Sequence, residues 1–476
     1  MLFTNYIIMK IRLLGVIFFV LTCTGIYSQS PADVYRKPLK EVLADIENRY
    51  KVKLNYSESL VKGVDVSYAT WRYRSDIEQT LSNILMPLDM IFQKTDGNSY
   101  QISRYAYHQR PVEEGRKHLD QLLSLYPDLV SWEKRREELK KCILEQAGLS
   151  PMPARTLLNP IHTPARKFDG YTVENVGIET LPGVYLCGSL YRPARGKGPF
   201  PAVLSPHGHF TSSDMNEVGR YRPDQQYRCA MLARMGAVVF SYEMFAYGES
   251  LLQVTADDHR TGLALTMQTI NSIRVVDFLT SLPYVDGTRI GVTGESGGGT
   301  QAFLLTALDD RITVSVPVVM VSSYFFGGCP CESGLPIHSC SGHGTNNAEI
   351  AAMASPRPML VISDGNDWTR HVPDIEFPYL ERVYDLYGKK SNVENVHLPD
   401  EGHDYGVSKR LAMYDFMAKH LGLNINAIRD KTGRIDESKV KIESYEAQLV
   451  FGKEGRLPPH AVKGAEGIRQ VIEALR

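Results

Sequence analysis

The stretch from Thr293 to Thr300, TGESGGGT, places a single serine among four glycines. Ser296 is the centre of a G-x-S-x-G motif, with Gly294 before it and Gly298 after it. This motif is typical of a nucleophile elbow, a strained turn between a strand and a helix that exposes the serine hydroxyl. A phosphate-binding loop would need a lysine that is missing here. The other alternative is that the glycines of this motif only allow a helix to pack closely on a strand. We expect Ser296 to be a nucleophile.

Two downstream loops offer the acid and the base that a serine nucleophile needs. They lie in SDGNDWT and EGHDYG, each after an apolar run, where catalytic groups of an open α/β sheet gather. We expect His403 to be the general base and Asp367 to orient it, which gives the chain order Ser, Asp, His. Asp364, in the same loop, is the alternative acid.

The oxyanion of a tetrahedral intermediate needs two backbone N–H donors. One is expected from Gly297, directly after the nucleophile. The other is expected from His209, in the loop SPHGHF that follows an earlier apolar run. We expect no metal ion at His207 or His209, which stand two positions apart on a glycine turn.

The segments that would position these residues alternate between apolar runs and helical patterns. Helical stretches such as DQQYRCAMLARMG and MQTINSIRVVDFLTSL separate several of the apolar runs. Near-continuous apolar strands separated by helices predict an α/β fold with a mainly parallel central sheet covered by helices on both faces. The predicted strands are residues 171–180, 184–193, 200–206, 237–243, 289–294, 312–322, 358–365 and 393–400.

Composition and charge exclude some classes of partner. The chain has 476 residues, of which 43% are hydrophobic and 22% charged, and its net charge is −1. No global field therefore favours nucleic acid or anionic membranes as partners. A neutral or uronic substrate, small or polymeric, is compatible with this balance.

The chain divides into five predicted segments. Residues 1–29 are typical of a signal peptide, because Lys10 and Arg12 precede an apolar run and small residues follow near Ser28. This predicts a secreted, periplasmic protein, with an uncleaved anchor or lipidation at Cys23 as alternatives. The remaining segments are a small α+β module at 30–105, a charged helical linker at 106–150, a catalytic domain at 151–425 and a C-terminal extension with a strand and a helix at 426–476.

Three cysteines lie close together in GGCPCESGLPIHSC: Cys329, Cys331 and Cys340. In an oxidising compartment one local disulfide is expected among them. The alternative is a zinc site that combines them with His338 or His343, although the C-x-C-x8-C spacing is not that of a standard zinc finger. We expect no metal and no cofactor.

Residues 150–425 resemble the α/β-hydrolase serine esterases common in gut Bacteroidetes, through SPHGHF, GVTGESGGGTQAF, PRPMLVISDGNDWT and DEGHDYGVSKR. Within that group the chain is similar to acetylxylan esterases and, more closely, to serine-type pectin methylesterases. The resemblance implies an α/β-hydrolase fold and the removal of methyl esters from uronic acids of pectin or a pectin-derived oligosaccharide. The alternatives are an acetyl esterase acting on xylan or pectin, and a catalytically silent protein that binds glycans or docks.

Residues 32–104 resemble the short N-terminal module of secretins and TonB-dependent receptors, through the spacing of KVKLNYSESLVKG and GNSYQI. The resemblance implies docking to an unknown protein or glycan. A small helper domain is the alternative.

A cleft for pectin, a plant cell-wall polysaccharide, should offer arginine to free carboxylates. Arg220 and Arg222 lie beside the predicted oxyanion loop, and Arg228 is a further candidate in the same stretch. Arg370 lies close to Asp367, and Trp368 between them could stack on a sugar face. A solvated surface loop is the alternative interpretation of each.

Overall fold

The computed structural model describes residues 36–67, 69–88, 90–95, 97–104, 109–333 and 337–476. The chain forms two compact units, one up to residue 105 and one from residue 106 onward. The predicted signal peptide, residues 1–29, and Cys23 lie outside the described residues. Among the helices that are described, none is long and apolar enough to cross a membrane.

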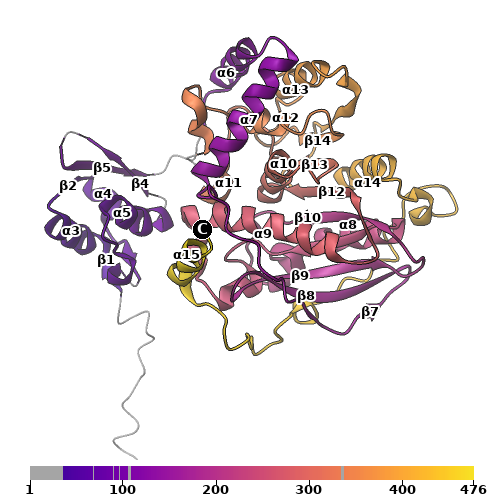
Figure 1. The fold of residues 1–476 in the computed structure, drawn as a ribbon, viewed down its shortest axis with the longest axis horizontal. Coiled ribbons are helices and arrows are strands. Elements are labelled where there is room, and N and C mark those ends of the chain that lie inside the picture. The colour runs from indigo at the N-terminus through magenta and orange to yellow at the C-terminus, as the bar shows by residue number, and fades with distance from the viewer. Residues whose placement is uncertain (1–35, 68, 89, 96, 105–108, 334–336) are drawn as a thin grey trace, which may run out of the picture. The chain divides into compact units, whose positions relative to one another are not determined.

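A ten-stranded sheet forms the centre of the second unit within its described residues (Figure 1). Its strands follow the order β15-β14-β13-β12-β10-β11-β9-β8-β6, and β7 pairs with β8. Strands β10 to β15 pair in parallel, whereas β6 to β9 pair antiparallel. The bounds are β6 Ile161–His162, β7 Arg166–Lys167, β8 Tyr171–Leu181, β9 Val184–Pro193, β10 Phe200–Pro206, β11 Val238–Tyr242, β12 Val285–Glu295, β13 Val314–Val318, β14 Met359–Asp364 and β15 Val393–Leu398.

The predicted α/β fold with a mainly parallel central sheet is confirmed. Each of the eight apolar runs forms a strand, from β8 to β15, within a few residues of the expected bounds. Every residue of β11 and β14 is buried, because helices cover both faces of the parallel part of the sheet.

The covering helices divide between the two faces of the sheet. Helices α8, Pro223–Met235, and α14, Val407–Leu421, bury their apolar side chains against one face. Helices α9, Gly262–Ser281, and α10, Gly297–Leu308, pack on the other. Helices α12, Asn347–Ala352, and α13, Glu376–Asp385, extend the layer that contains α10.

The described part of the predicted linker, residues 109–150, packs into the core of the second unit. Helices α6, Val112–Leu125, and α7, Leu129–Gln146, bury Leu122, Trp132 and Leu139 in the same cluster as residues of α9, α10 and α13. The start of α7 is set by a local signal, since the Asp128 carboxylate accepts the N–H of Ser131.

The C-terminal extension differs in part from its prediction. The helix is present as α15, Gly464–Ala474, and buries Ile468 and Ile472 in the core of the second unit. From residue 426 to the end the structure has no strand, apart from an isolated bridge between Arg429 and Ile435.

The first unit is a small α+β structure, as its periodicity predicts. Its helices are α3 Leu39–Tyr50, α4 Glu58–Val61 and α5 Ile77–Leu85, and its strands are β1 Lys37–Pro38, β2 Lys53–Asn55, β3 Asp65–Val66, β4 Met90–Lys94 and β5 Ser99–Arg104. Strands β2, β5 and β4 form one sheet, and β1 pairs with β3. The apolar faces of α3 and α5 meet in a core of their own.

Candidate active site

Ser296 lies between the end of β12 and the first residue of α10, with φ of 54° and ψ of −123°. A non-glycine residue with positive φ is strained, and this conformation is the one expected of a nucleophile elbow. The flanking glycines leave no room for side chains. A Cβ on Gly294 would lie 2.6 Å from the main chain of Gly298, and one on Gly298 would lie 2.5 Å from the carbonyl oxygen of Pro206. The glycines therefore allow the turn as well as the close packing of α10.

The loop after β10 passes directly beside the serine. A Cβ on Gly208 would lie 3.1 Å from the Cβ of Ser296. The Gly208 N–H donates to the Glu295 carboxylate at 3.3 Å, and His207 Nε2 accepts the N–H of Met244 at 3.0 Å. Burial lowers the pKa of His207 to about 3, so the ring is neutral and can accept that bond. Glu295 and His207 thus hold the loop in place.

Two backbone donors remain at the elbow, on Gly297 and on His209. Neither N–H donates a hydrogen bond to any residue that the structure describes. The two residues are close neighbours, because a Cβ on Gly297 would lie 2.5 Å from the His209 ring. A pair of unused N–H groups next to a strained serine is what an oxyanion hole requires.

Asp367 and His403 form a direct pair. His403 Nδ1 lies 2.7 Å from Asp367 Oδ2, while the N–H and the hydroxyl of Thr369 donate to Asp367 Oδ1 at 2.5 and 2.6 Å. The carboxylate accepts from Nδ1–H, so the Nε2 of His403 has a free lone pair that could accept a proton. Ser296 Oγ makes no hydrogen bond to His403 here, and such bonds often tighten only when substrate binds.

Asp364, the alternative acid, has a different partner. Its side chain is fully buried and forms an ion pair with Lys409 Nζ at 3.2 Å. The same ammonium also reaches Glu401 and Asp404. Lys409 projects from α14, so its ion pair with Asp364 holds that helix against the end of β14. Asp364 and Asp367 therefore differ in their partners, a lysine for the first and a histidine for the second.

Trp368 and Arg370 flank the Asp367–His403 pair. The half-buried Trp368 ring lies 4.4 Å from the His403 ring and 4.1 Å from that of Phe325, measured between centroids. Arg370 is exposed, and its guanidinium interacts with the hydroxyl of Tyr324. An aromatic face and a cation therefore border the candidate base.

Arg222 lies beside the oxyanion loop. Its guanidinium carbon is 3.3 Å from the centroid of the Phe210 ring, and its Nε pairs with Asp224 at 3.1 Å. Its Nη1 is buried and has no hydrogen-bond partner among the described residues.

Arg220 and Arg228 are buried in the protein, contrary to the expectation that they bind substrate. The Arg220 guanidinium pairs with Glu243 and Glu249 at 3.0 and 3.3 Å. Arg228 pairs with Glu295 at 2.7 Å and with Asp224. Their donors are used inside the fold, so both arginines are left out of the site.

The cysteines pair in a way that their spacing did not reveal. Cys340 forms a disulfide with Cys142 on α7, 198 residues away in the chain. Cys329 and Cys331 lie with their sulfurs in bonding contact, which agrees with the one local disulfide expected among the three cysteines. The predicted alternative of a zinc site with His338 or His343 is not assembled among the described residues, since His338 Nε2 bonds to Asn347 at 2.9 Å and neither ring joins the group of ligand atoms around Cys329 and Cys331.

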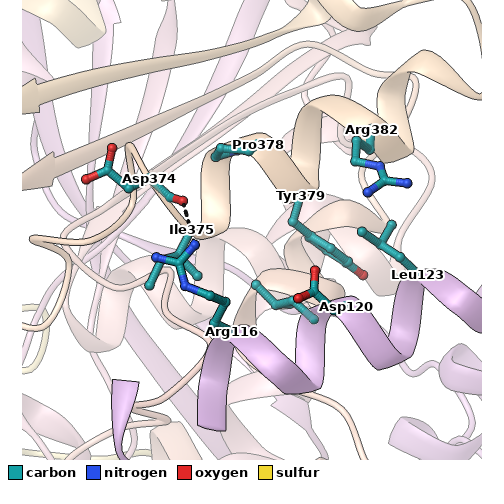
Figure 2. A pocket seen from close by; sticks show the side chains of 9 residues that line it. Arg116, Asp120, Leu123, Asp374, Ile375, Pro378, Tyr379 and Arg382 are labelled. Carbon is teal, nitrogen blue, oxygen red and sulfur yellow. Dashed lines mark hydrogen bonds between the residues drawn. The ribbon is translucent and has the colours of Figure 1, made fainter. Parts of the chain in front are cut away.

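A separate pocket lies between α6 and α13 (Figure 2). Arg116 and Asp120 from α6 face Tyr379 and Arg382 from α13 across it, and Arg116 Nη1 donates to the carbonyl of Asp374 at 3.5 Å. None of the candidate catalytic residues lines this pocket.

Comparison with known proteins decides the family. The solved structure of methylesterase BT1017 is 45% identical, with a TM-score of 0.71, and the match covers 93% of this chain and 96% of that chain. The chain belongs to the family of methylesterase BT1017. It is a carboxylic ester hydrolase with the α/β-hydrolase fold.

Further comparisons match smaller parts of this chain. The family model described as acetyl xylan esterase (AXE1) matches residues 147–325. YtaP of Bacillus subtilis (strain 168), a protein named as a hydrolase, is 29% identical over 135 residues, which are 26% of this chain and 45% of that protein. A glucuronoyl esterase from Solibacter usitatus aligns over 62% of this chain and 94% of its own, at 18% identity and a TM-score of 0.45.

Proposed function

We propose that this esterase removes methyl esters from uronic acids in pectin or a pectin-derived oligosaccharide. The observation that carries the proposal is the similarity to a methylesterase over nearly the full length of both chains, at 45% identity. The elbow serine beside two unused N–H donors supports ester cleavage by covalent catalysis.

In the proposed reaction Ser296 Oγ attacks the ester carbonyl while His403 Nε2 accepts the hydroxyl proton. Asp367 holds His403 Nδ1–H, which fixes the tautomer and stabilises the imidazolium. The Gly297 and His209 N–H groups stabilise the oxyanion. Methanol leaves with the proton from His403, and the uronate remains as an acyl ester on Ser296. A water molecule, deprotonated by His403, then releases the uronic acid.

Charges and rings near the triad support a uronate substrate. Methyl-esterified sugars in pectin have neighbours with free carboxylates, which favour arginine as a partner. Arg370 is exposed three positions after Asp367, and Arg222 lies on Phe210 beside the oxyanion loop. Trp368 offers an aromatic face next to His403.

A second candidate is an acetyl esterase, with acetate as the acyl group. The match of residues 147–325 to the acetyl xylan esterase family model favours it. The same triad would serve, but the sugar would be the leaving alcohol and the arginines would have no carboxylate to bind.

The two candidates differ in the product that leaves. We would incubate the protein with methylated pectin, acetylated pectin and acetylated xylan, and measure methanol and acetate. The proposal expects methanol, and it expects Ser296→Ala to lower kcat by at least about 10⁴-fold with an unchanged circular dichroism spectrum. Release of acetate without methanol would exclude the methylesterase. An active Ser296→Ala protein would exclude the proposed nucleophile.

We also propose that residues 1–29 direct export to the periplasm and that the first unit docks to a protein or glycan. Cell fractionation and N-terminal sequencing of the mature protein test the export. Cytoplasmic protein that retains its N-terminus would contradict it.

A further inference from the structure

Four side chains from separate segments meet beside the elbow: His209 in the oxyanion loop, His259 in the short 3-10 helix Ala256–Arg260, and Cys329 and Cys331 near the start of α11, Pro330–Ser333. Their donor atoms all lie within 4.8 Å of one another. His209 Nε2 is 2.8 Å from His259 Nε2, 2.9 Å from Cys331 Sγ and 3.4 Å from Cys329 Sγ. His259 Nε2 is 3.6 Å from Cys329 Sγ. The cluster therefore converges on one point.

The hydrogen bonds of the two Nδ1 atoms show that the lone pair of each ring is on Nε2. His209 Nδ1 lies 2.9 Å from the Glu332 carboxylate, and His259 Nδ1 lies 2.6 Å from the carbonyl oxygen of Phe245. Both partners only accept hydrogen bonds, so each Nδ1 carries the proton. A neutral ring protonated at Nδ1 presents a lone pair at Nε2. Two lone pairs thus face each other at 2.8 Å, an arrangement that a shared proton or a metal ion bound to both nitrogens would stabilise.

The two sulfurs supply the charge that such a cation would meet. Cys329 and Cys331 are buried, and so are His259 and Glu332. Two thiolates and two neutral imidazoles around a divalent ion sum to zero charge, which suits a buried site. A Cys329–Cys331 disulfide, which the contact between these sulfurs also allows, would use up both thiolates and leave no sulfur ligand for a metal ion.

We propose that His209, His259, Cys329 and Cys331 bind one zinc ion. Two sulfur and two nitrogen ligands are a set that structural zinc sites use, and histidine ligands characteristically donate their second N–H to a carboxylate or a backbone carbonyl. Glu332 and Phe245 are those second partners. With four protein ligands the ion has no open position, so its role is to hold the fold and not to activate water.

The ion would hold the oxyanion loop against the elbow. His209 contributes its side chain to the cluster and its ring lies against Gly297, while its N–H donates to no described residue and is free for the proposed oxyanion. A zinc ion bound there would therefore position His209 through its ring. This consequence for catalysis rests on the proposed function, whereas zinc binding itself does not.

The test compares metal content in three forms of the full chain, expressed with its own N-terminal residues and purified without chelator or reductant. These are the natural sequence, Cys329→Ser/Cys331→Ser, and Cys187→Ala as a control at a buried cysteine outside the cluster. Mass spectrometry of the metals is expected to find about one zinc per chain in the first and third forms, and a loss of at least tenfold in the second. Iodoacetamide applied to denatured, unreduced, natural-sequence protein should alkylate Cys329 and Cys331.

Absence of metal together with an unalkylated, disulfide-linked Cys329–Cys331 peptide would overturn the proposal. Equal zinc in the natural sequence and the double variant would overturn it too, because the ion would be bound elsewhere. If the double variant fails to fold, the metal content and the alkylation of the natural-sequence protein decide the test.

On an ester substrate, zinc removal is expected to lower kcat about tenfold or more and to change KM little. If the natural sequence binds zinc at the cluster but zinc removal does not lower kcat, the positioning role is contradicted. The proposed zinc site itself would then still stand.

Discussion

At the scale of single residues, the site depends on which counter-charge each carboxylate meets. Asp364 ends β14 and Asp367 lies three positions later, yet Asp364 faces Lys409 at 3.2 Å and Asp367 faces His403 at 2.7 Å. A general base is oriented only by the acid that accepts from its Nδ1–H. The geometry therefore assigns different roles to two residues of the same type.

Asparagine at each position separates these roles. We expect Asp367→Asn to lower kcat by about 10³- to 10⁴-fold, because an amide can favour the wrong tautomer of His403. Asp364→Asn should keep kcat within about threefold of the original, since Lys409 retains Asp404 at 2.8 Å. Steady-state kinetics on one methyl ester measures both. Equal losses in the two variants would contradict the assignment.

Arg370 is expected to bind a free carboxylate of the substrate. Arg370→Ala should raise KM for a partly de-esterified oligogalacturonide by about three- to tenfold and leave kcat nearly unchanged, because an exposed ion pair contributes modestly. The neutral methyl ester of galacturonic acid should show no effect. Arg382→Ala is the matched control, since Arg382 lines the pocket between α6 and α13 (Figure 2). A similar rise in KM on both substrates would rule out carboxylate recognition.

At the scale of elements, the elbow is a junction of β10, β12 and α10 that only glycine permits. The first turn of α10 meets the end of β10 so closely that a Cβ on Gly298 would lie 2.5 Å from Pro206 O, 2.9 Å from Pro206 C and 3.0 Å from His207 C. All three are main-chain atoms and cannot rotate away. The helix must shift to accept any side chain there.

Gly298→Ala should therefore damage both stability and catalysis. We expect a loss of about 1–3 kcal/mol in the free energy of unfolding, as in other overpacked cores, and a fall in kcat of more than tenfold. Gly262→Ala is the control, because a Cβ there meets nothing within 4 Å and alanine should be neutral or slightly stabilising. Urea denaturation and ester kinetics measure the two effects. Equal stability of both variants would show that the junction is looser than described.

Local patterns predicted the elements well and their long-range partners poorly. The eight strands and the elbow could be recognised because apolar runs and glycine spacing lie within a few residues. Arg220 could not be recognised as buried, because Glu243 and Glu249 supply its counter-charges from 23 and 29 positions away. The cluster of His209, His259, Cys329 and Cys331 could not be predicted either, because its members are far apart in the sequence and nothing in ADDHR indicates that His259 is a ligand.

At the scale of the whole molecule, the hydrolase unit begins earlier than the pattern of its strands suggests. Arg135 on α7 is buried and pairs with Glu349 at 2.9 Å, and Trp132 Nε1 donates to Ser355. The Cys142–Cys340 disulfide joins the same helix to residues on the far side of the nucleophile in the sequence. The segment was expected to be a charged helical linker, but Arg135 and Trp132 have partners more than 200 residues away.

Two truncations test where the folding unit starts. A chain of residues 106–476 keeps every contact of the second unit, so we expect its thermal midpoint and its kcat on a small methyl ester to match those of the full chain. A chain of residues 151–476 exposes the apolar surface that Trp132, Leu139 and Ile143 cover and leaves the Glu349 carboxylate buried without its cation. Breaking a buried pair costs about 3–5 kcal/mol, a large share of a domain's stability, so the shorter chain should be insoluble or unfolded. Gel filtration and circular dichroism decide between these outcomes. A folded, active chain of residues 151–476 would mean that α6 and α7 are the linker that their sequence suggests.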